Sequence, residues 1–301
     1  MEEGEYSDSI FDSLVLDSNE LRCRHTETSF EYGVEVTVQD ADGNRFSSYW
    51  WDATPMLKDL NIKDCGEIAF KRAMSQIGPV KIESGKYSMV IESEVASRLV
   101  TPVLNALGGY SLQQKNSFML DSLGKKMFPE WLNIWDRPVS VGETGSRLFD
   151  SEGVATAEMP IVENGVVKEY FVNTYMSRKM GVEATVEDAT RPVVLPCFAP
   201  SVAEPVEATC GKEELMRIVG EGILVTGFNG GNSNSATGDF SFGVEGFLFK
   251  DGKIVHPVRE MLITGNLLTL WNNLLAAGND ARFCKSKLIP TLAFGNVDFS
   301  A

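Results

Sequence analysis

The sequence predicts an α+β fold, made mainly of antiparallel β-sheet with a few packed helices. Three Asn-Gly or Asp-Gly pairs, at 42–43, 164–165 and 251–252, each stand between runs that are rich in strand-forming residues. Such pairs supply the positive φ angles of a type I′ turn, so each pair predicts a β-hairpin. Apolar and polar residues alternate in 34–39, which is typical of a sheet with one solvated face.

A helical spacing of apolar residues adds the helices to this fold. It occurs in residues 65–76, 95–107, 212–219 and 267–277. Gly278 follows the last segment, in the place of a helix C-terminal cap. Pro102 lies inside the second segment and is expected to kink or interrupt it, because proline has no N–H to donate.

Two segments do not fit either pattern. Residues 186–205 contain Pro192, Pro196 and Pro200, which is too much proline for a central strand. We expect a long surface loop there. Residues 1–20 are acidic with weak periodicity, and we expect them to be an incomplete piece of a preceding element.

Composition and charge narrow the classes of partner. The chain has 301 residues, 43% of them apolar, which is enough for a substantial core. A net charge of −15 argues against nucleic-acid binding, and no run of about 18 apolar residues predicts a membrane span. The start of the sequence lacks signal-peptide features, and the five scattered cysteines form no Cys-x-x-Cys pair. These features predict a cytoplasmic protein whose cysteines are free core thiols.

The sequence offers little support for a catalytic site of its own. His25 and His256 are its only histidines, so no helix can carry two zinc-binding imidazoles one turn apart, and each is expected to be a structural residue on a strand. Ser241, His256 and Asp239 lack the Gly-x-Ser-x-Gly turn that exposes a nucleophile. A hydrolase acting alone through Asp239 or Cys197 would have no base positioned by the sequence.

Residues 230–241 are rich in glycine, asparagine and serine, and they contain no lysine for a nucleotide phosphate. Neutral donors and acceptors suit a peptide backbone, and the alternating segment 239–249 is a strand that could pair with an extended peptide at its edge. A plain structural turn remains the alternative. The residues expected to contact a peptide are Gly230, Gly231, Asn232, Ser233, Asn234, Thr237, Gly238, Asp239 and Ser241.

Several motifs along the chain form a family pattern. They are SFMLDSLGKKMF, FDSEGVAT, VVKEYFVNTYMSRKMG, the stretch from Gly231 to Leu274 that begins GNSNSATGDFSFG, and the terminal PTLAFGNVDFSA. From about Ser29 to Ala301 the chain resembles the PmbA/TldE branch of the TldD/TldE family. The resemblance implies a TldD/TldE-type C-terminal domain at 76–301, with 1–75 as the remainder of a middle α+β region. Family members also carry a further N-terminal domain, which we do not expect here.

The resemblance implies a non-catalytic, substrate-binding subunit of a zinc metallopeptidase complex that degrades unfolded peptides or matures peptide precursors. A TldD-type partner would carry the zinc on a His-Glu-x-x-x-His helix. Thr101, Pro102 and Ala106 stand at those positions here, and Cys284 cannot be carried over as the cysteine ligand. We therefore expect no metal and no cofactor on this chain, and whether it is itself an enzyme stays open.

The sequence also leaves an alternative function, and the family has an older label that implies another one. The alternative is a homodimer that binds peptides or small molecules and has no peptidase activity. The family's older label, modulator of DNA gyrase, implies a link to nucleic acid that the charge of −15 argues against.

Overall fold

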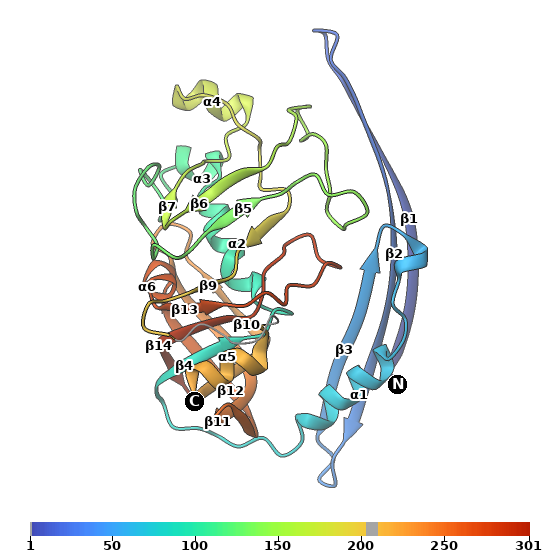
Figure 1. The fold of residues 1–301 in the computed structure, drawn as a ribbon, viewed down its shortest axis with the longest axis vertical. Coiled ribbons are helices and arrows are strands. Elements are labelled where there is room, and N and C mark those ends of the chain that lie inside the picture. Colours follow the sequence, from blue (N-terminus) through green and yellow to red (C-terminus); the bar gives the residue numbers. More distant parts are fainter. Residues whose placement is uncertain (1, 203–209) are drawn as a thin grey trace.

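The computed structural model describes residues 2–202 and 210–301. A long, curved three-stranded antiparallel sheet, in the order β1-β2-β3, stands beside the larger body of the protein (Figure 1). Its elements are β1 (Glu3–Leu16), β2 (Arg22–Gln39), β3 (Arg45–Thr54), the 3₁₀ helix η1 (Leu57–Asp59) and α1 (Cys65–Ser75). Helix α1 packs on the sheet, where Cys65 and Ala69 contact Val34 and Val36.

Five strands of the larger body form a closed ring. In order around it they are β12 (Lys253–Asn266), β11 (Asp239–Lys250), β10 (Gly222–Ser233), β4 (Gly85–Ile91) and β14 (Leu292–Ser300), and β14 pairs again with β12. Only β10 and β4 are parallel, and β13 (Leu274–Ala277) and β9 (Cys197–Phe198) extend the sheet from β14. Helix α5 (Lys212–Val219) contacts four strands of the ring, β4, β14, β10 and β12.

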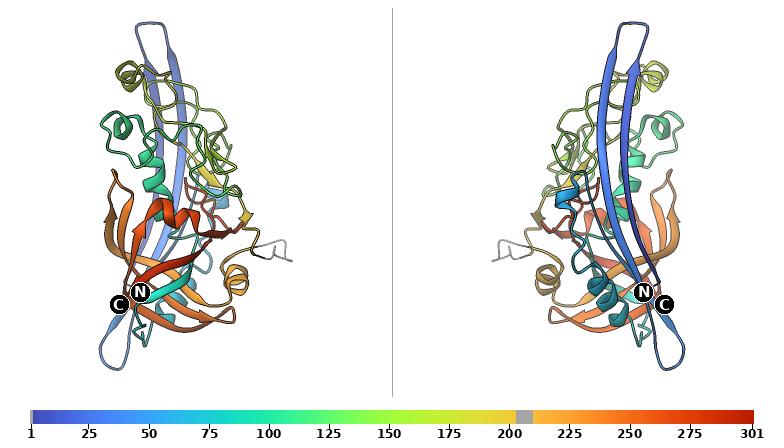
Figure 2. Two further views of the ribbon diagram at one scale, coloured as in Figure 1. Left: turned by 90° about the vertical axis from the view of Figure 1, so that its left-hand side faces the viewer. Right: turned by 90° about the vertical axis from the view of Figure 1, so that its right-hand side faces the viewer.

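A smaller sheet, in the order β7-β6-β5-β8, lies beyond the ring, as the views in Figure 2 show. Its strands are β5 (Ile134–Asp136), β6 (Met159–Glu163), β7 (Val166–Val167) and β8 (Pro192–Val194). The remaining helices are α2 (Ser97–Ala106), α3 (Gly109–Gln113), α4 (Thr174–Met180) and α6 (Leu267–Asn272). The main core joins α2 and α6 to the ring: Leu99 and Val103 of α2 share it with Trp271 of α6 and Phe242 of β11.

The predicted fold class is confirmed, and the three hairpins form. Asn164 and Asp251 have φ angles of 50° and 51°, and the glycines after them are also positive, as a type I′ turn requires. The first hairpin differs. Only Gly43 has a positive φ there, and the side chain of Asp40 closes a longer turn by accepting hydrogen bonds from the backbone N–H groups of Asp42 and Asn44.

Two helix predictions need correction, whereas the helices expected at 65–76 and 212–219 form as α1 and α5. Helix α2 continues through Pro102 to Ala106, so the proline does not interrupt it. The last helix, α6, ends at Asn272, and Leu274–Ala277 is a strand instead. These apolar residues pair with β14 and β9, so the tertiary sheet overrides their helical spacing. Gly278 therefore follows a strand.

Two other segments also differ from the predictions. In the region expected to be a surface loop, β8 and β9 are short strands at the edges of their sheets, and Val193, Val194 and Cys197 are buried. Its proline content excluded a central strand but not these edge strands. The acidic start of the chain forms β1, which pairs with β2 along its whole length, from Glu3 opposite Glu35 to Leu16 opposite Arg22.

The other features of the described chain can be stated briefly. All five cysteines are free thiols, and all but the half-buried Cys23 are buried, which confirms the expectation for them. Within residues 2–202 and 210–301, no helix is long and apolar enough to cross a membrane.

Candidate functional site

Helix α2 presents one polar face to solvent, and a cavity lies on each side of it. Arg98, Thr101 and Asn105 recur at helical spacing on this face, while Leu99, Val100 and Val103 are buried behind it. Thr101 and Asn105 line both cavities. The two cavities therefore meet across the exposed face of α2.

The first cavity lies between α2 and β10, and we call it the β10 cavity. Its volume is about 660 Å³, and its wall includes Phe118, Phe228 and Phe242 as well as polar residues of α2 and β10. Arg98 spans one side of it, because Nη2 donates a hydrogen bond to the carbonyl oxygen of Gly231 at 2.8 Å. The guanidinium of Arg98 also lies 5.1 Å from the centre of the Phe242 ring.

Part of one edge of β10 is free at this cavity. Strand β4 pairs with β10 only along Ile223–Val225. From Gly227 to Ser233, in the part of the chain that the structure describes, that edge has no backbone partner and only Arg98 bonds to it. Such an edge can accept an extended peptide. The edge is not the expected one, because β11 is hydrogen-bonded to β10 on one side and to β12 on the other.

The tip of the glycine- and asparagine-rich loop is a self-contained turn. Asn234 Oδ1 accepts hydrogen bonds from the backbone N–H groups of Ala236 and Thr237. Asn266 Nδ2 donates to the carbonyl oxygen of Thr237 and to Asp239 Oδ1. The hydrogen bonds from Asn266 and Thr237 hold the pKa of Asp239 below its usual range, so this carboxylate stays ionised.

The nine residues expected to contact a peptide thus fall into different places. Asn232 and Ser233 line the β10 cavity, and the carbonyl of Gly231 bonds to Arg98 at its side. The others do not line this cavity; they are Gly230, Asn234, Thr237, Gly238, Asp239 and Ser241. The β10 end of the loop therefore lies at the cavity, whereas the side chains at its tip make hydrogen bonds within the turn. A peptide contact at any of the nine stays a prediction.

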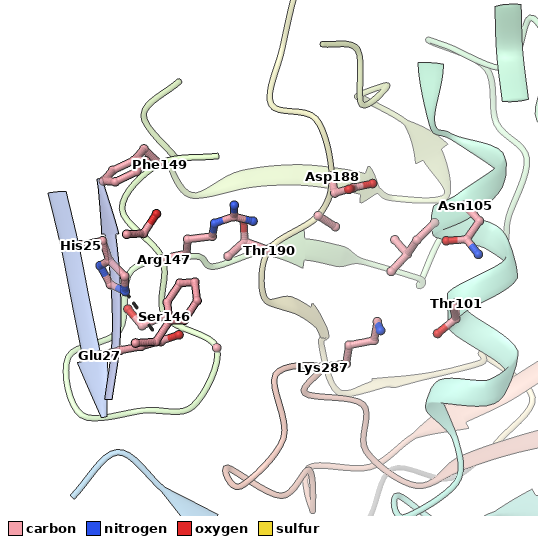
Figure 3. Close-up of a pocket in the computed structure, with 15 residues that line it drawn as sticks. His25, Glu27, Thr101, Asn105, Ser146, Arg147, Phe149, Asp188, Thr190 and Lys287 are labelled. Atoms are coloured by element: carbon pink, nitrogen blue, oxygen red, sulfur yellow. Dashed lines mark ion pairs between the residues drawn. The ribbon is translucent and has the colours of Figure 1, made fainter. Parts of the chain in front are cut away.

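The second cavity lies between α2 and the β1–β2 hairpin, and we call it the hairpin cavity (Figure 3). Its volume is about 640 Å³, and its charged lining residues are Glu27, Arg147, Asp188 and Lys287, with His25 beside them. His25 Nε2 is 3.7 Å from Glu27 Oε2, and the imidazole ring packs edge-on against Phe149. Burial and the neighbouring charge of Glu187 raise the pKa of Asp188.

The structure does not assemble the catalytic combinations that the sequence left open. Ser241 lies opposite Thr264 and His256 opposite Leu248, so Ser241 and His256 are roughly 20 Å apart along the strands, at about 3.3 Å per residue. His25 and His256 both lie on strands, as predicted. Cys197 is buried, and burial raises the pKa of its thiol to about 12, which leaves almost no thiolate for nucleophilic attack.

The positions at which the resemblance implies metal ligands in a TldD-type partner correspond to residues of α2 in this chain. Thr101 and Pro102 line the β10 cavity, and Ala106 is buried at its edge. Thr101 Oγ1 donates a hydrogen bond to the carbonyl of Ser97. None of these side chains is a usual metal ligand, and Cys284 lines a different cavity. In residues 2–202 and 210–301, no three His, Cys, Asp or Glu side chains form a group that could hold a metal ion.

Comparison with known proteins agrees with this architecture. The model of the PmbA/TldA metallopeptidase C-terminal domain matches residues 84–301, and that of the central domain matches residues 2–77. The chain belongs to the PmbA/TldD metallopeptidase family. It is 30% identical over 263 residues to the metalloprotease PmbA of Escherichia coli O157:H7, covering 85% of this chain and 56% of that protein. It is 35% identical over 215 residues to a PmbA homologue of Haemophilus influenzae, covering 71% of this chain and 46% of that one.

Solved structures of other proteins share this fold. A Bacteroides thetaiotaomicron protein described as a modulator of DNA gyrase is 41% identical, with a TM-score of 0.93 over 99% of this chain and 66% of that one. A Thermotoga maritima protein of the same description is 25% identical, with a TM-score of 0.88 over 99% of this chain and 68% of that one. The chain spans about half the length of the curated relatives that it matches.

Among the residues that sequence reasoning missed are the three cationic residues of the two cavities, Arg98, Arg147 and Lys287. They come from a helix and two loops that are far apart in the sequence, and none of them belongs to a motif with a chemical meaning of its own. Only the helical spacing of Arg98, Thr101 and Asn105 could have placed one of the three on a common polar face.

Proposed function

We propose that this chain is the non-catalytic, substrate-binding subunit of a TldD/TldE-type zinc metallopeptidase complex. In this proposal it acts in the cytoplasm, on unfolded peptides or peptide precursors, and the zinc ion belongs to a TldD-type partner. The observation that carries the proposal is the polar face of α2. This face separates two cavities and has Thr101 and Pro102 where a metallopeptidase helix would have its ligands.

The free edge of β10 supports peptide as the ligand. It offers backbone N–H and C=O groups from Gly227 to Ser233 beside a cavity of about 660 Å³. Main-chain hydrogen bonds of this kind bind an extended chain with little demand on its sequence. A substrate without fixed structure is the kind of ligand that such an edge can accept.

The proposal is tested by the hydrolysis of an unstructured peptide. We expect no turnover by this chain alone, and more turnover by a mixture with a TldD-type partner than by that partner alone, with a chelator abolishing it. Turnover by this chain alone would contradict the non-catalytic assignment. If the mixture is no more active than the partner alone, the chain is not a subunit of such a complex, and a separate binding protein becomes the better assignment.

A pair of variants tests the role of α2. Asn105 is exposed between the two cavities, so Asn105→Trp should block both and lower turnover by the mixture at least about tenfold, the effect of losing 1.4 kcal/mol of binding. Gln114 is exposed just after α3 and lines neither cavity, so Gln114→Trp is the matched control and should leave turnover unchanged. Equal turnover by the two variants would show that the cavities beside α2 do not bind substrate during turnover.

A further inference from the structure

The hairpin cavity contains a half-buried cation without a partner. In residues 2–202 and 210–301, Lys287 makes no ion pair and no side-chain hydrogen bond, although it lines the cavity. Figure 3 shows its side chain rising into the cavity on the side of Thr101. The nearby Lys285 is different, because it donates to the carbonyl of Glu94 and pairs with its carboxylate at 3.0 Å. An ammonium group held at a cavity wall without an acceptor is suited to an anionic ligand.

The other charged groups of the hairpin cavity are less suited than Lys287 to bind an anionic ligand. Glu27 faces His25 at 3.7 Å, and Arg147 lies 3.8 Å from Glu187. Asp188 is acidic, so it does not attract an anionic ligand. Lys287 is therefore the charged group of this cavity that most needs a ligand, and that ligand must carry negative charge where it meets the lysine.

Neutral groups beside Lys287 fit the end of a peptide. The hydroxyl of Thr101 already donates to Ser97, so its oxygen is left to accept a hydrogen bond from a peptide N–H. Asn105 is exposed, and its side-chain amide makes no hydrogen bond within the described part of the chain, so this amide can donate to a carboxylate oxygen or a peptide carbonyl. Phe149 and Leu104 supply apolar wall for a terminal side chain.

The two cavities share part of their lining on α2. An extended chain that pairs with β10 beside Ser233 can cross α2 at Thr101 and Asn105, which line both cavities, and enter the hairpin cavity. We propose that the hairpin cavity binds the C-terminal carboxylate of a peptide through Lys287, with Thr101 and Asn105 binding the last peptide groups. The inference rests on the proposed peptide-binding function and adds an orientation: the peptide's C-terminus lies in the hairpin cavity.

The test compares two peptides that differ at one group. Both are short, unstructured and acetylated at the N-terminus; one ends in a free carboxylate and the other in an amide, and binding to the full chain is measured by calorimetry. Long-range repulsion from a net charge of −15 favours the amide, so a preference for the acid must come from a local site. We expect the acid to bind at least about tenfold more tightly, the size of one charge-assisted hydrogen bond.

Two lysine variants locate the site. Lys287→Met should reduce the preference for the acid to about twofold or less and leave binding of the amide unchanged. Lys250→Met, at an exposed strand end that lines neither cavity, should keep the full preference. If both peptides bind the native chain equally, or if Lys287→Met keeps the preference, the carboxylate site is wrong and peptide binding still stands. If neither peptide binds, the proposed function itself fails.

Discussion

Glu92 is the residue that most directly joins the two parts matched by the family models. It is buried after β4, and it accepts two hydrogen bonds from Arg72 of α1, at 3.0 and 2.8 Å, and one from Lys212 of α5 at 2.6 Å. Trp50 of β3 is part of the same contact, because the guanidinium groups of Arg72 and Arg282 lie 5.2 and 4.3 Å from the centre of its ring. The position of the three-stranded sheet therefore depends on a few charged side chains.

Removing the charge of Glu92 should destabilise the protein strongly. Glu92→Gln leaves Arg72 and Lys212 without their counterion, and we expect the free energy of unfolding to fall by about 3 kcal/mol in urea denaturation. Glu67→Gln is the control. It removes one partner of the exposed pair with Lys71, which water and salt screen, so it should leave the free energy of unfolding nearly unchanged. Similar values for the two variants would show that the buried network adds no stability.

The same residue predicts a dependence on pH. Burial alone would raise the pKa of Glu92, but the hydrogen bonds and charges of Arg72 and Lys212 outweigh burial and lower it. A lowered pKa in the folded state means that the contribution of Glu92 is complete above the ordinary pKa of a glutamate and is lost as pH falls through the folded value. The melting temperature of the native chain should therefore decline more steeply in acid than that of Glu92→Gln.

At the scale of elements, the pairing of β10 with β11 requires glycine at position 231 of β10. Gly231 has a φ of +88°, and a Cβ atom there would lie 2.0 Å from the carbonyl oxygen of Ser241 on the neighbouring strand. The residue that the sequence suggested as a peptide contact is thus required by the pairing of β10 with β11.

Substitution of Gly231 should therefore act on folding first. Gly231→Ala forces a side chain into the left-handed region and against a backbone oxygen, so we expect it to lower the free energy of unfolding by about 2 kcal/mol. Asn232→Ala, at the next and exposed position, should change stability by less than about 0.5 kcal/mol. Urea denaturation of both variants checks this, and a Gly231→Ala protein as stable as the native chain would show that the strands can move apart without cost.

At the scale of the whole molecule, β1 is exposed along its length. It is the edge strand of its sheet, and Figure 2 shows the hairpin of β1 and β2 extending past the body of the protein. Large apolar side chains on β1 are between 52% and 76% exposed; they are Tyr6, Ile10, Phe11, Leu14 and Leu16. An exposed, apolar edge strand is a site at which chains associate.

We expect the chain to self-associate through β1 at high protein concentration. Ile10 is 76% exposed, and Ile10→Lys should raise the dissociation constant about tenfold, since burial of one such side chain is worth roughly 1.5–3 kcal/mol. Tyr110→Lys, at a residue of α3 that is 67% exposed, is the control and should have no effect. Salt should strengthen association of the native chain by screening its net charge of −15. A monomeric native chain in sedimentation experiments at all salt concentrations would contradict this prediction.

The sequence by itself determined the local structure and the class of fold. Hairpin positions followed from Asn164–Gly165 and Asp251–Gly252, because the φ angles that such turns need are available to few residues. Helices α1 and α5 followed from their apolar spacing. The motif pattern also predicted the family, which the two domain models confirm. With only two histidines, the sequence predicts that no helix carries two zinc-binding imidazoles.

Only the tertiary structure decided which edges and cavities those elements form. In the closed ring both edges of β11 are paired, whereas part of one edge of β10 is not. Leu274–Ala277 is a strand because it pairs with β14 on one side and β9 on the other. His25, Thr101 and Lys287 line one cavity although they are far apart in the sequence. Sequence periodicity reports the contacts of near neighbours, whereas cavities are made by distant ones, so they depend on the packing of the whole chain.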